Sequence, residues 1–213
     1  MQEIPENNET METEPAETDL APDTEAPKGI KAELVDWMDV LAVSVVAVVL
    51  IFTFFFRVVT ISGDSMKNTL LNEEKVIISN MFYTPEYGDI VVISRNTNNS
   101  LNPDEYAEPI IKRVIAVAGQ TVDIDYEAGI VYVDGVPLKE DYTRTLTTLK
   151  HDYEIDFPAY VPDNCIFVMG DNRNESLDSR SQFIGDNGMI DTRYVLGKAV
   201  YRIYPFSRFG GLY

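Results

Sequence analysis

The sequence is poor in the residues that most hydrolytic and metal-binding sites use. Its 213 residues include one cysteine and one histidine. A single cysteine excludes an intramolecular disulfide, and together with one histidine it cannot form a zinc ligand set. We therefore expect no bound metal and no cofactor. The hydrolase patterns G-x-S-x-G, S-x-x-K and H-E-x-x-H are also absent, so any catalytic serine needs an unusual base.

Positive charge is scarce as well. The chain has 17 Lys and Arg against 35 Asp and Glu, a net charge of −18. Nucleic-acid-binding proteins need a basic surface, so we expect no nucleic-acid partner. Half of the net charge lies in residues 1–36, where 2 − 11 = −9, and this segment has no aromatic residue. Such a composition cannot bury enough apolar surface to offset its ordering entropy, which predicts a disordered acidic tail over 1–36.

One long apolar run follows this segment. Residues 40–56 carry no charge. On one side Trp37 can anchor at the membrane interface, and on the other Arg57 can extend its charge outward to water. With these flanks the run is long enough to span a bilayer, and it predicts a transmembrane anchor over 37–57. A buried core helix and a cleavable secretory signal are alternatives. The long acidic preceding segment, with no small-x-small pattern after the run, favours an uncleaved anchor, while the flanking charges do not fix its orientation.

The rest of the chain, 58–213, has the pattern of an antiparallel β-domain. Short β-branched runs alternate with turn residues, and Asp134-Gly135 after an apolar run is typical of a hairpin turn. We predict a mainly β, barrel-like domain with an insertion around 120–165, and the polar connections 95–109 and 139–160 as surface insertions. The predicted strands are 58–61, 76–79, 90–94, 110–117, 121–125, 130–133, 165–169 and 197–204.

Ser65 is a candidate nucleophile that lies nine residues after the apolar run. Its base could be a lysine, but only about one free lysine in 2,500 is neutral at pH 7, so the lysine should be desolvated by apolar neighbours. Lys112, in the apolar run 109–117, fits best, and Lys198 is the next candidate. His151 lies in a charged loop, which argues against a Ser-His-Asp triad.

Four motifs occur in the order of the conserved boxes of bacterial type I signal peptidases. They are Ser62-Gly-Asp-Ser-Met-Lys-Asn-Thr-Leu70, Gly88-Asp-Ile-Val-Val92, Ile111-Lys-Arg-Val-Ile-Ala-Val-Ala-Gly119 and Gly170-Asp-Asn-Arg-Asn-Glu-Ser-Leu-Asp-Ser-Arg180. The chain resembles that family from the apolar run to its C-terminus. The resemblance implies a membrane-bound serine endopeptidase that cleaves signal peptides from exported preproteins after small-x-small sites.

The resemblance also implies a role for individual residues. Ser65 would be the nucleophile and Lys112 its general base, with Ser176 orienting the lysine amine and Asp178 and Arg180 bracing the loop. Small side chains of the substrate would enter shallow apolar pockets, whose lining would be Val59, Ile61, Met66, Leu70 and Ile111.

Two positions depart from the family pattern. Gly63 stands where some members have a serine that donates to the oxyanion, and Asn68 stands where proline is usual. The expected partners are preproteins and membrane lipid, and no oligomeric state follows from the sequence. Single-span members keep the N-terminus in the cytoplasm and the catalytic domain outside, and we expect the same here. A self-cleaving Ser-Lys regulator and a non-catalytic anchored β-domain that binds a partner are the alternatives.

Overall fold

The computed structural model of the protein describes residues 30–94, 109–150 and 153–212. The chain divides into two units, at Val45 and Val46, within one long helix. This helix, α1, spans Ile30–Phe55. It begins earlier than predicted, so residues 30–36, predicted as tail, are helical. It also ends before the predicted limit of 57, because Phe56 and Arg57 pair with the next strand.

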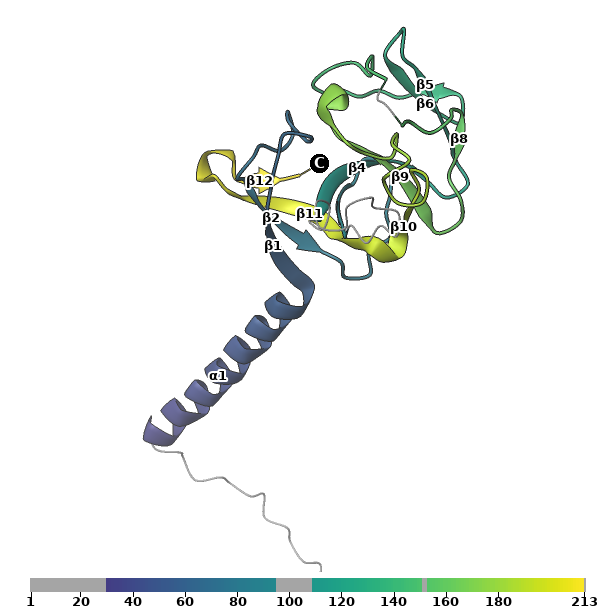
Figure 1. Ribbon diagram of the computed structural model, residues 1–213. Helices are drawn as coiled ribbons and strands as arrows, with labels where there is room; N and C mark the ends of the chain where they lie inside the picture. Colours follow the sequence, from purple (N-terminus) through teal and green to yellow (C-terminus); the bar gives the residue numbers. More distant parts are fainter. Residues whose placement is uncertain (1–29, 95–108, 151–152, 213) are drawn as a thin grey trace, which may run out of the picture. The chain divides into compact units, whose positions relative to one another are not determined.

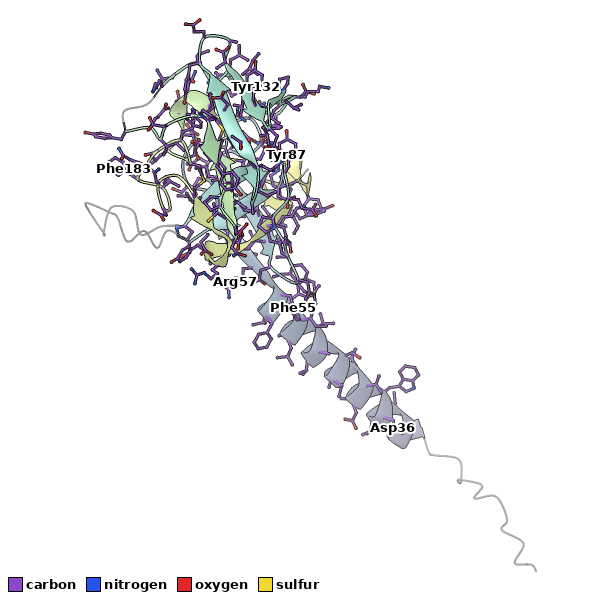
Figure 2. All side chains as sticks on the ribbon, turned by 90° about the vertical axis from the view of Figure 1, so that its right-hand side faces the viewer. Asp36, Phe55, Arg57, Tyr87, Tyr132 and Phe183 are labelled. Carbon is purple, nitrogen blue, oxygen red and sulfur yellow. The ribbon has the colours of Figure 1, made fainter. Side chains whose placement is uncertain are left out.

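The side chains of α1 are exposed from Leu34 to Phe55. Figure 2 shows them pointing away from the ribbon between the labelled Asp36 and Phe55. This exposure does not fit a buried core helix, which was one alternative reading of the apolar run. The segment from Leu34 to Phe55 contains an 18-residue window with a mean hydropathy of 2.6, and its 22 residues are long and apolar enough to cross a membrane.

Two antiparallel sheets form the rest of the structure. The larger has the order β1-β2-β11-β3-β4-β9-β10, with β12 paired to β11, and the smaller has the order β7-β6-β5-β8. The strands are β1 Phe56–Thr60, β2 Lys75–Ser79, β3 Ile90–Ile93, β4 Ile110–Val117, β5 Thr121–Asp125, β6 Ile130–Val133, β7 Val136–Pro137, β8 Ala159–Tyr160, β9 Cys165–Met169, β10 Ile190–Asp191, β11 Val195–Tyr204 and β12 Gly210–Gly211.

The predicted mainly β, antiparallel fold is confirmed. Figure 1 shows how strongly the large sheet curls at β4 and β9, with β5, β6 and β8 standing beside it as a separate layer. The hairpin between β6 and β7 is also confirmed: Asp134 and Gly135 have φ of 51° and 76°, the positive values that a type I′ turn requires. The small sheet lies within the predicted insertion, 120–165.

Apolar side chains of the large sheet form the core beneath the loop that carries Ser65. Ile61, Met66 and Leu70 from this loop pack with Ile111 of β4 and with side chains of β2, β3 and β11. A second cluster joins side chains of β4 and β9 to those of the small sheet. Burial of this apolar area stabilises the loop against the sheet and fixes its position relative to β4.

Candidate active site

The loop 61–74 carries Ser65 and is closed at its base by two backbone hydrogen bonds. The N–H of Ile61 donates to the carbonyl of Glu74 at 2.8 Å, and the N–H of Glu73 donates to the carbonyl of Ile61 at 2.9 Å. Within it, Leu70 N donates to Met66 O at 2.9 Å, a helix-like turn that directly follows the serine. The loop thus presents Ser65 on a compact, anchored turn.

Lys112 lies on β4 and reaches this serine. Its Nζ is 2.7 Å from Ser65 Oγ and 3.0 Å from the carbonyl oxygen of Ile111. The lysine is 3% exposed, whereas Ser65 is half-buried. The two residues predicted from the sequence as nucleophile and base are therefore in hydrogen-bonding contact across 47 residues of chain.

The turn after β9 holds the backbone of the serine. The N–H of Asn172 donates to the carbonyl of Ser65 at 3.0 Å, and its side-chain amide donates to the carbonyl of Asp64 at 3.1 Å. Gly170 leaves no room for a side chain, since a Cβ there would lie 2.5 Å from Ser65 O and 2.2 Å from Ser176 Oγ. Only glycine therefore permits this approach. Sequence reasoning identified the motif but not the role of Asn172.

Asp178 and Arg180 form a buried ion pair behind the same turn. Their side chains are 0% and 1% exposed, so the pair is not an ordinary surface pair. Asp178 Oδ2 accepts from the N–H of Gly170 at 3.0 Å, and Arg180 Nη2 donates to the carbonyls of Arg173 and Ser176 at 2.6 and 3.3 Å. The pair thus holds three backbone groups of the loop 170–176.

Ser176 is buried beside Gly170, but the predicted hydrogen bond between its hydroxyl and the amine of Lys112 is not formed. Its Oγ has no hydrogen-bond partner among the described residues, so it does not hydrogen-bond to Lys112. Gly170 is its close neighbour, as the space around a Cβ at that position shows. The role of Ser176 in orienting the lysine remains a proposal.

A second buried ion pair, missed from the sequence, lies next to the lysine. Arg113 donates to both carboxylate oxygens of Asp171, at 2.8 and 2.7 Å, and to the carbonyl of Gly88 at 2.7 Å. The hydroxyl of Thr69, on the serine loop, donates to Asp171 and accepts from Arg113. Burial opposes the charge of Arg113, but the hydrogen bonds that it donates to Asp171 and the charge of that carboxylate outweigh burial and raise the pKa of the guanidinium.

The five predicted pocket residues belong to one hydrophobic cluster. Four of them are buried, with Ile111 the most exposed at 8%, and Val59 on β1 is partly buried. The structure brings together Val59, Ile61, Met66, Leu70 and Ile111. Most of this surface is therefore core packing, and only its margin can face a ligand.

The other candidate bases do not belong to this site. Lys198 lies on β11 and forms an ion pair with Asp89 at 2.5 Å. His151 lies outside the described residues. Lys112 is therefore the candidate base that contacts Ser65 directly.

Both departures from the family pattern have a backbone explanation. Gly63 has φ of +86°, a conformation that other L-residues adopt only with strain, although the space around it is open. Asn68 has φ of +105°, which proline cannot reach because its ring fixes φ near −65°. The backbone of the loop therefore has φ angles that Gly63 and Asn68 can adopt.

Serine peptidases whose general base is a lysine combine a serine hydroxyl with a lysine amine in this way. The family model described as "Signal peptidase, peptidase S26" matches residues 34–204. The chain belongs to this family of signal peptidases, and the resemblance seen in its motifs is confirmed.

Two relatives agree with this assignment, and one solved structure is reported with them for its similarity alone. The probable signal peptidase I-1 of Synechocystis is 35% identical over 176 residues, which cover 81% of this chain and 83% of that protein. Signal peptidase I P of Bacillus subtilis subsp. natto is 31% identical over 84% of this chain and 93% of its own length. A crystal structure of a signal peptidase I from Enterococcus faecalis V583 covers 55% of this chain and 97% of its own, with 26% identity and a TM-score of 0.39.

Proposed function

We propose that the protein is a signal peptidase I, a membrane-anchored serine endopeptidase that removes signal peptides from exported preproteins after small-x-small sites. Ser65 acts as the nucleophile and Lys112 as the general base. The observation that carries this assignment is the 2.7 Å contact between Ser65 Oγ and a lysine amine that is buried in the sheet.

The geometry supports an acyl-enzyme mechanism with one proton carrier. Lys112 Nζ, when neutral, accepts the proton of Ser65 Oγ as the oxygen attacks the scissile carbonyl carbon. The tetrahedral intermediate collapses, the C–N bond breaks, and the lysine returns the proton to the departing amine. Water then enters, Lys112 accepts one of its protons, and attack on the ester releases the signal peptide with Ser65 regenerated.

Electrostatic stabilisation of the oxyanion falls to backbone donors. The N–H of Ser65 is the proposed first donor, because the turn that presents the serine also fixes its peptide group. Gly63 offers no side chain, so no side-chain donor comes from that position. A lost oxyanion donor typically costs about 3 kcal/mol of barrier, so the serine loop must be held firmly.

Substrate specificity follows from the shallow apolar margin beside the serine. We propose that the exposed part of Val59 and the edge of Ile111 receive small side chains, while the buried Ile61, Met66 and Leu70 form the floor. Large side chains would overlap with this floor and be rejected. The same apolar floor keeps water from Lys112, which disfavours its charged form.

The membrane setting is the last part of the proposal. The helix α1 spans the bilayer with its N-terminus in the cytoplasm, and the catalytic domain lies outside, against lipid. Protease added to intact protoplasts should then digest the domain 58–213 and spare an epitope placed at the N-terminus. Protection of the domain and loss of the epitope would reverse this orientation.

Incubation of the detergent-solubilised protein with a preprotein that bears an Ala-x-Ala site tests the function. Mass spectrometry should find two products separated at that site. Ser65→Ala and Lys112→Ala should each abolish cleavage, whereas the matched control Lys198→Ala, which changes a lysine outside the site, should retain it. Cleavage by either dyad variant would exclude this mechanism. Absence of cleavage by the wild type would favour a non-catalytic β-domain.

The pH dependence of kcat/KM gives a second test. A neutral lysine is required, so the rate should rise as pH increases, along a limb that titrates well below the value of about 10.4 for a free lysine. A profile that stays flat from about pH 6 to 10 would contradict a lysine base.

A further inference from the structure

An irregular segment of the insertion crosses the loop behind the active site. We call residues 139–150, which follow β7, the strap. The N–H of Arg144 donates to the carbonyl of Asp171 at 2.9 Å, and the N–H of Leu149 donates to Asn174 Oδ1 at 3.2 Å. The sequence predicted this segment as a surface insertion, but its backbone is bonded to the turn that holds Ser65.

A buried ion pair anchors the strap. Arg173, whose side chain is fully buried, donates from both terminal nitrogens to the carboxylate of Glu140, and from Nη1 to Thr147 Oγ1 at 3.0 Å. Arg173 Nε also donates to the carbonyl of Gly170 at 3.1 Å. One guanidinium thus joins two points of the strap to the loop 170–176.

Tyr142, in the middle of the strap, contacts the site more directly. The centroid of its ring lies 4.0 Å from Cζ of Arg113, the residue that follows the lysine on β4. Its carbonyl accepts a hydrogen bond from the side chain of Asn68, three residues after the serine, at 3.2 Å. Tyr142 therefore contacts both chain segments that supply the dyad, while the strap holds the third segment at Asp171.

The ring of Tyr142 covers a pair of charges whose geometry matters. Arg113 and Asp171 are 2% and 1% exposed, and Thr69 joins them to the serine loop. A guanidinium over an aromatic face is attracted to the ring. An ion pair that is covered from water is also stronger, because water no longer competes for its hydrogen bonds. Removing the ring would admit water to the charges that connect β4, the turn after β9 and the serine loop.

We propose that Tyr142 is a positioning residue for the Ser65–Lys112 pair. It acts through Arg113 and Asn68 and makes no contact of its own with substrate. For turnover the proposal rests on the proposed function, since it assigns Tyr142 a role in that reaction. It also explains Asn68: the asparagine adopts a φ closed to proline and gains a hydrogen bond to the strap.

Kinetics on a matched set of variants test this role. Tyr142→Ala removes the ring, Tyr142→Phe keeps it, and Leu146→Ala changes an exposed side chain of the same strap. Tyr142→Ala should lower kcat about tenfold to a hundredfold with KM changed less than about twofold, because misplacement of reacting groups acts on the chemical step. Tyr142→Phe and Leu146→Ala should stay within about twofold of wild type. Circular dichroism confirms that each sample is folded at the assay temperature.

Hydrogen–deuterium exchange tests the same inference without turnover. In Tyr142→Ala, the amides of residues 66–70 should exchange faster than in wild type, while Leu146→Ala leaves them unchanged. Equal kcat and equal exchange in Tyr142→Ala and wild type would overturn the inference. A loss of kcat in Tyr142→Phe as large as in Tyr142→Ala would do so too. If the wild type cleaves no preprotein, the proposed function fails, and the exchange result alone decides whether Tyr142 orders the loop.

Discussion

Within the described residues, two Asp-x-Arg segments form an internal ion pair with nearly the same geometry. In the first, Arg180 Nε and Nη2 lie 2.8 and 2.9 Å from the two carboxylate oxygens of Asp178. In the second, Arg193 Nε and Nη2 lie 3.0 and 2.7 Å from those of Asp191. In both, the backbone N–H of the arginine also donates to the aspartate. The spacing permits this geometry but does not impose it, since in Asp171-Asn-Arg173 the aspartate pairs with Arg113 and the arginine with Glu140.

Their surroundings differ completely. The side chains of Asp178 and Arg180 are buried, whereas that of Arg193 is 81% exposed and that of Asp191 is 26% exposed. The buried pair also holds backbone groups of the loop beside Ser65, while Asp191 caps the short 3-10 helix Thr192–Tyr194. The comparison teaches that the geometry of an ion pair does not reveal its structural role. Burial matters more, because buried charges must also hydrogen-bond to the groups around them.

The pKa of each aspartate is lowered, for different reasons. Burial tends to raise the pKa of Asp178, but the Arg180 charge and the hydrogen bonds that Arg180 and Gly170 donate lower it below its usual range. For Asp191 the hydrogen bonds from Arg193 come first, and burial has little weight. The same direction of shift therefore reflects a strong coupling in one pair and a local hydrogen bond in the other.

The largest expected difference between the pairs is in stability. Asp178→Asn leaves a buried, uncompensated guanidinium and should lower the free energy of unfolding by about 3–5 kcal/mol. Asp191→Asn, its matched control, should leave the denaturation midpoint unchanged because water solvates Arg193. Urea unfolding at pH 7, followed by circular dichroism, measures both. Equal midpoint shifts for the two variants would contradict the distinction drawn from burial.

Which pair is buried could not have been predicted from the local sequence, whereas much of the fold could. Strands at 110–117, 121–125 and 165–169 were predicted with their observed bounds because β-branched runs end at turn residues. The two-residue strands β7, β8, β10 and β12 were not separately predicted, since such short pairings are created by tertiary contacts. The burial of Asp178 depends on β9 and the loop 170–176 closing around it, and the three-residue pattern Asp-x-Arg carries no information on that closure.

The site shows the same division. Ser65 and Lys112 were identified from a motif and from an apolar strand, and their contact agrees with that expectation. The role of Tyr142 could not be predicted from the sequence, because a tyrosine in a polar segment predicts only a surface loop. Its contact with Arg113 joins residues 29 positions apart through packing alone. The order of the four family motifs identified the chain segments that supply the site, but it did not identify the strap that covers them.

A double substitution sharpens the comparison by separating stability from catalysis. Asp178→Leu with Arg180→Met replaces the buried pair by apolar side chains of similar size and leaves no uncompensated charge, so it should cost less stability than Asp178→Asn. Turnover should nevertheless stay at least about tenfold low, because the N–H of Gly170 loses its acceptor and two loop carbonyls lose their donor. Unfolding curves and kcat on the same preparations measure this. Full recovery of kcat would show that the pair only fills space.

The pH dependence of stability gives a smaller effect with a defined sign. The pKa of Asp178 is lower in the folded than in the unfolded protein, so its stabilisation is complete above the unfolded value, about pH 4, and is lost as the pH falls through the folded value. Wild type should therefore lose stability below about pH 4, and its advantage over Asp178→Asn should shrink there. Urea midpoints between pH 2 and 7 test this. A constant advantage across that range would mean that the carboxylate is not the source of the difference.

Salt should produce the smallest effect and act on the exposed pair alone. Raising ionic strength from 0.1 to 1 M shortens the Debye length from about 10 Å to about 3 Å, which screens charges in contact with water but hardly affects buried ones. Any residual difference between wild type and Asp191→Asn should then disappear at 1 M NaCl, while the difference for Asp178→Asn persists. Chloride is suitable because it is only weakly excluded from protein surfaces, unlike sulfate. If salt instead removed the difference in urea midpoint between wild type and Asp178→Asn, water would have access to that ion pair. The contacts of the pair with the loop beside Ser65 could then not depend on burial.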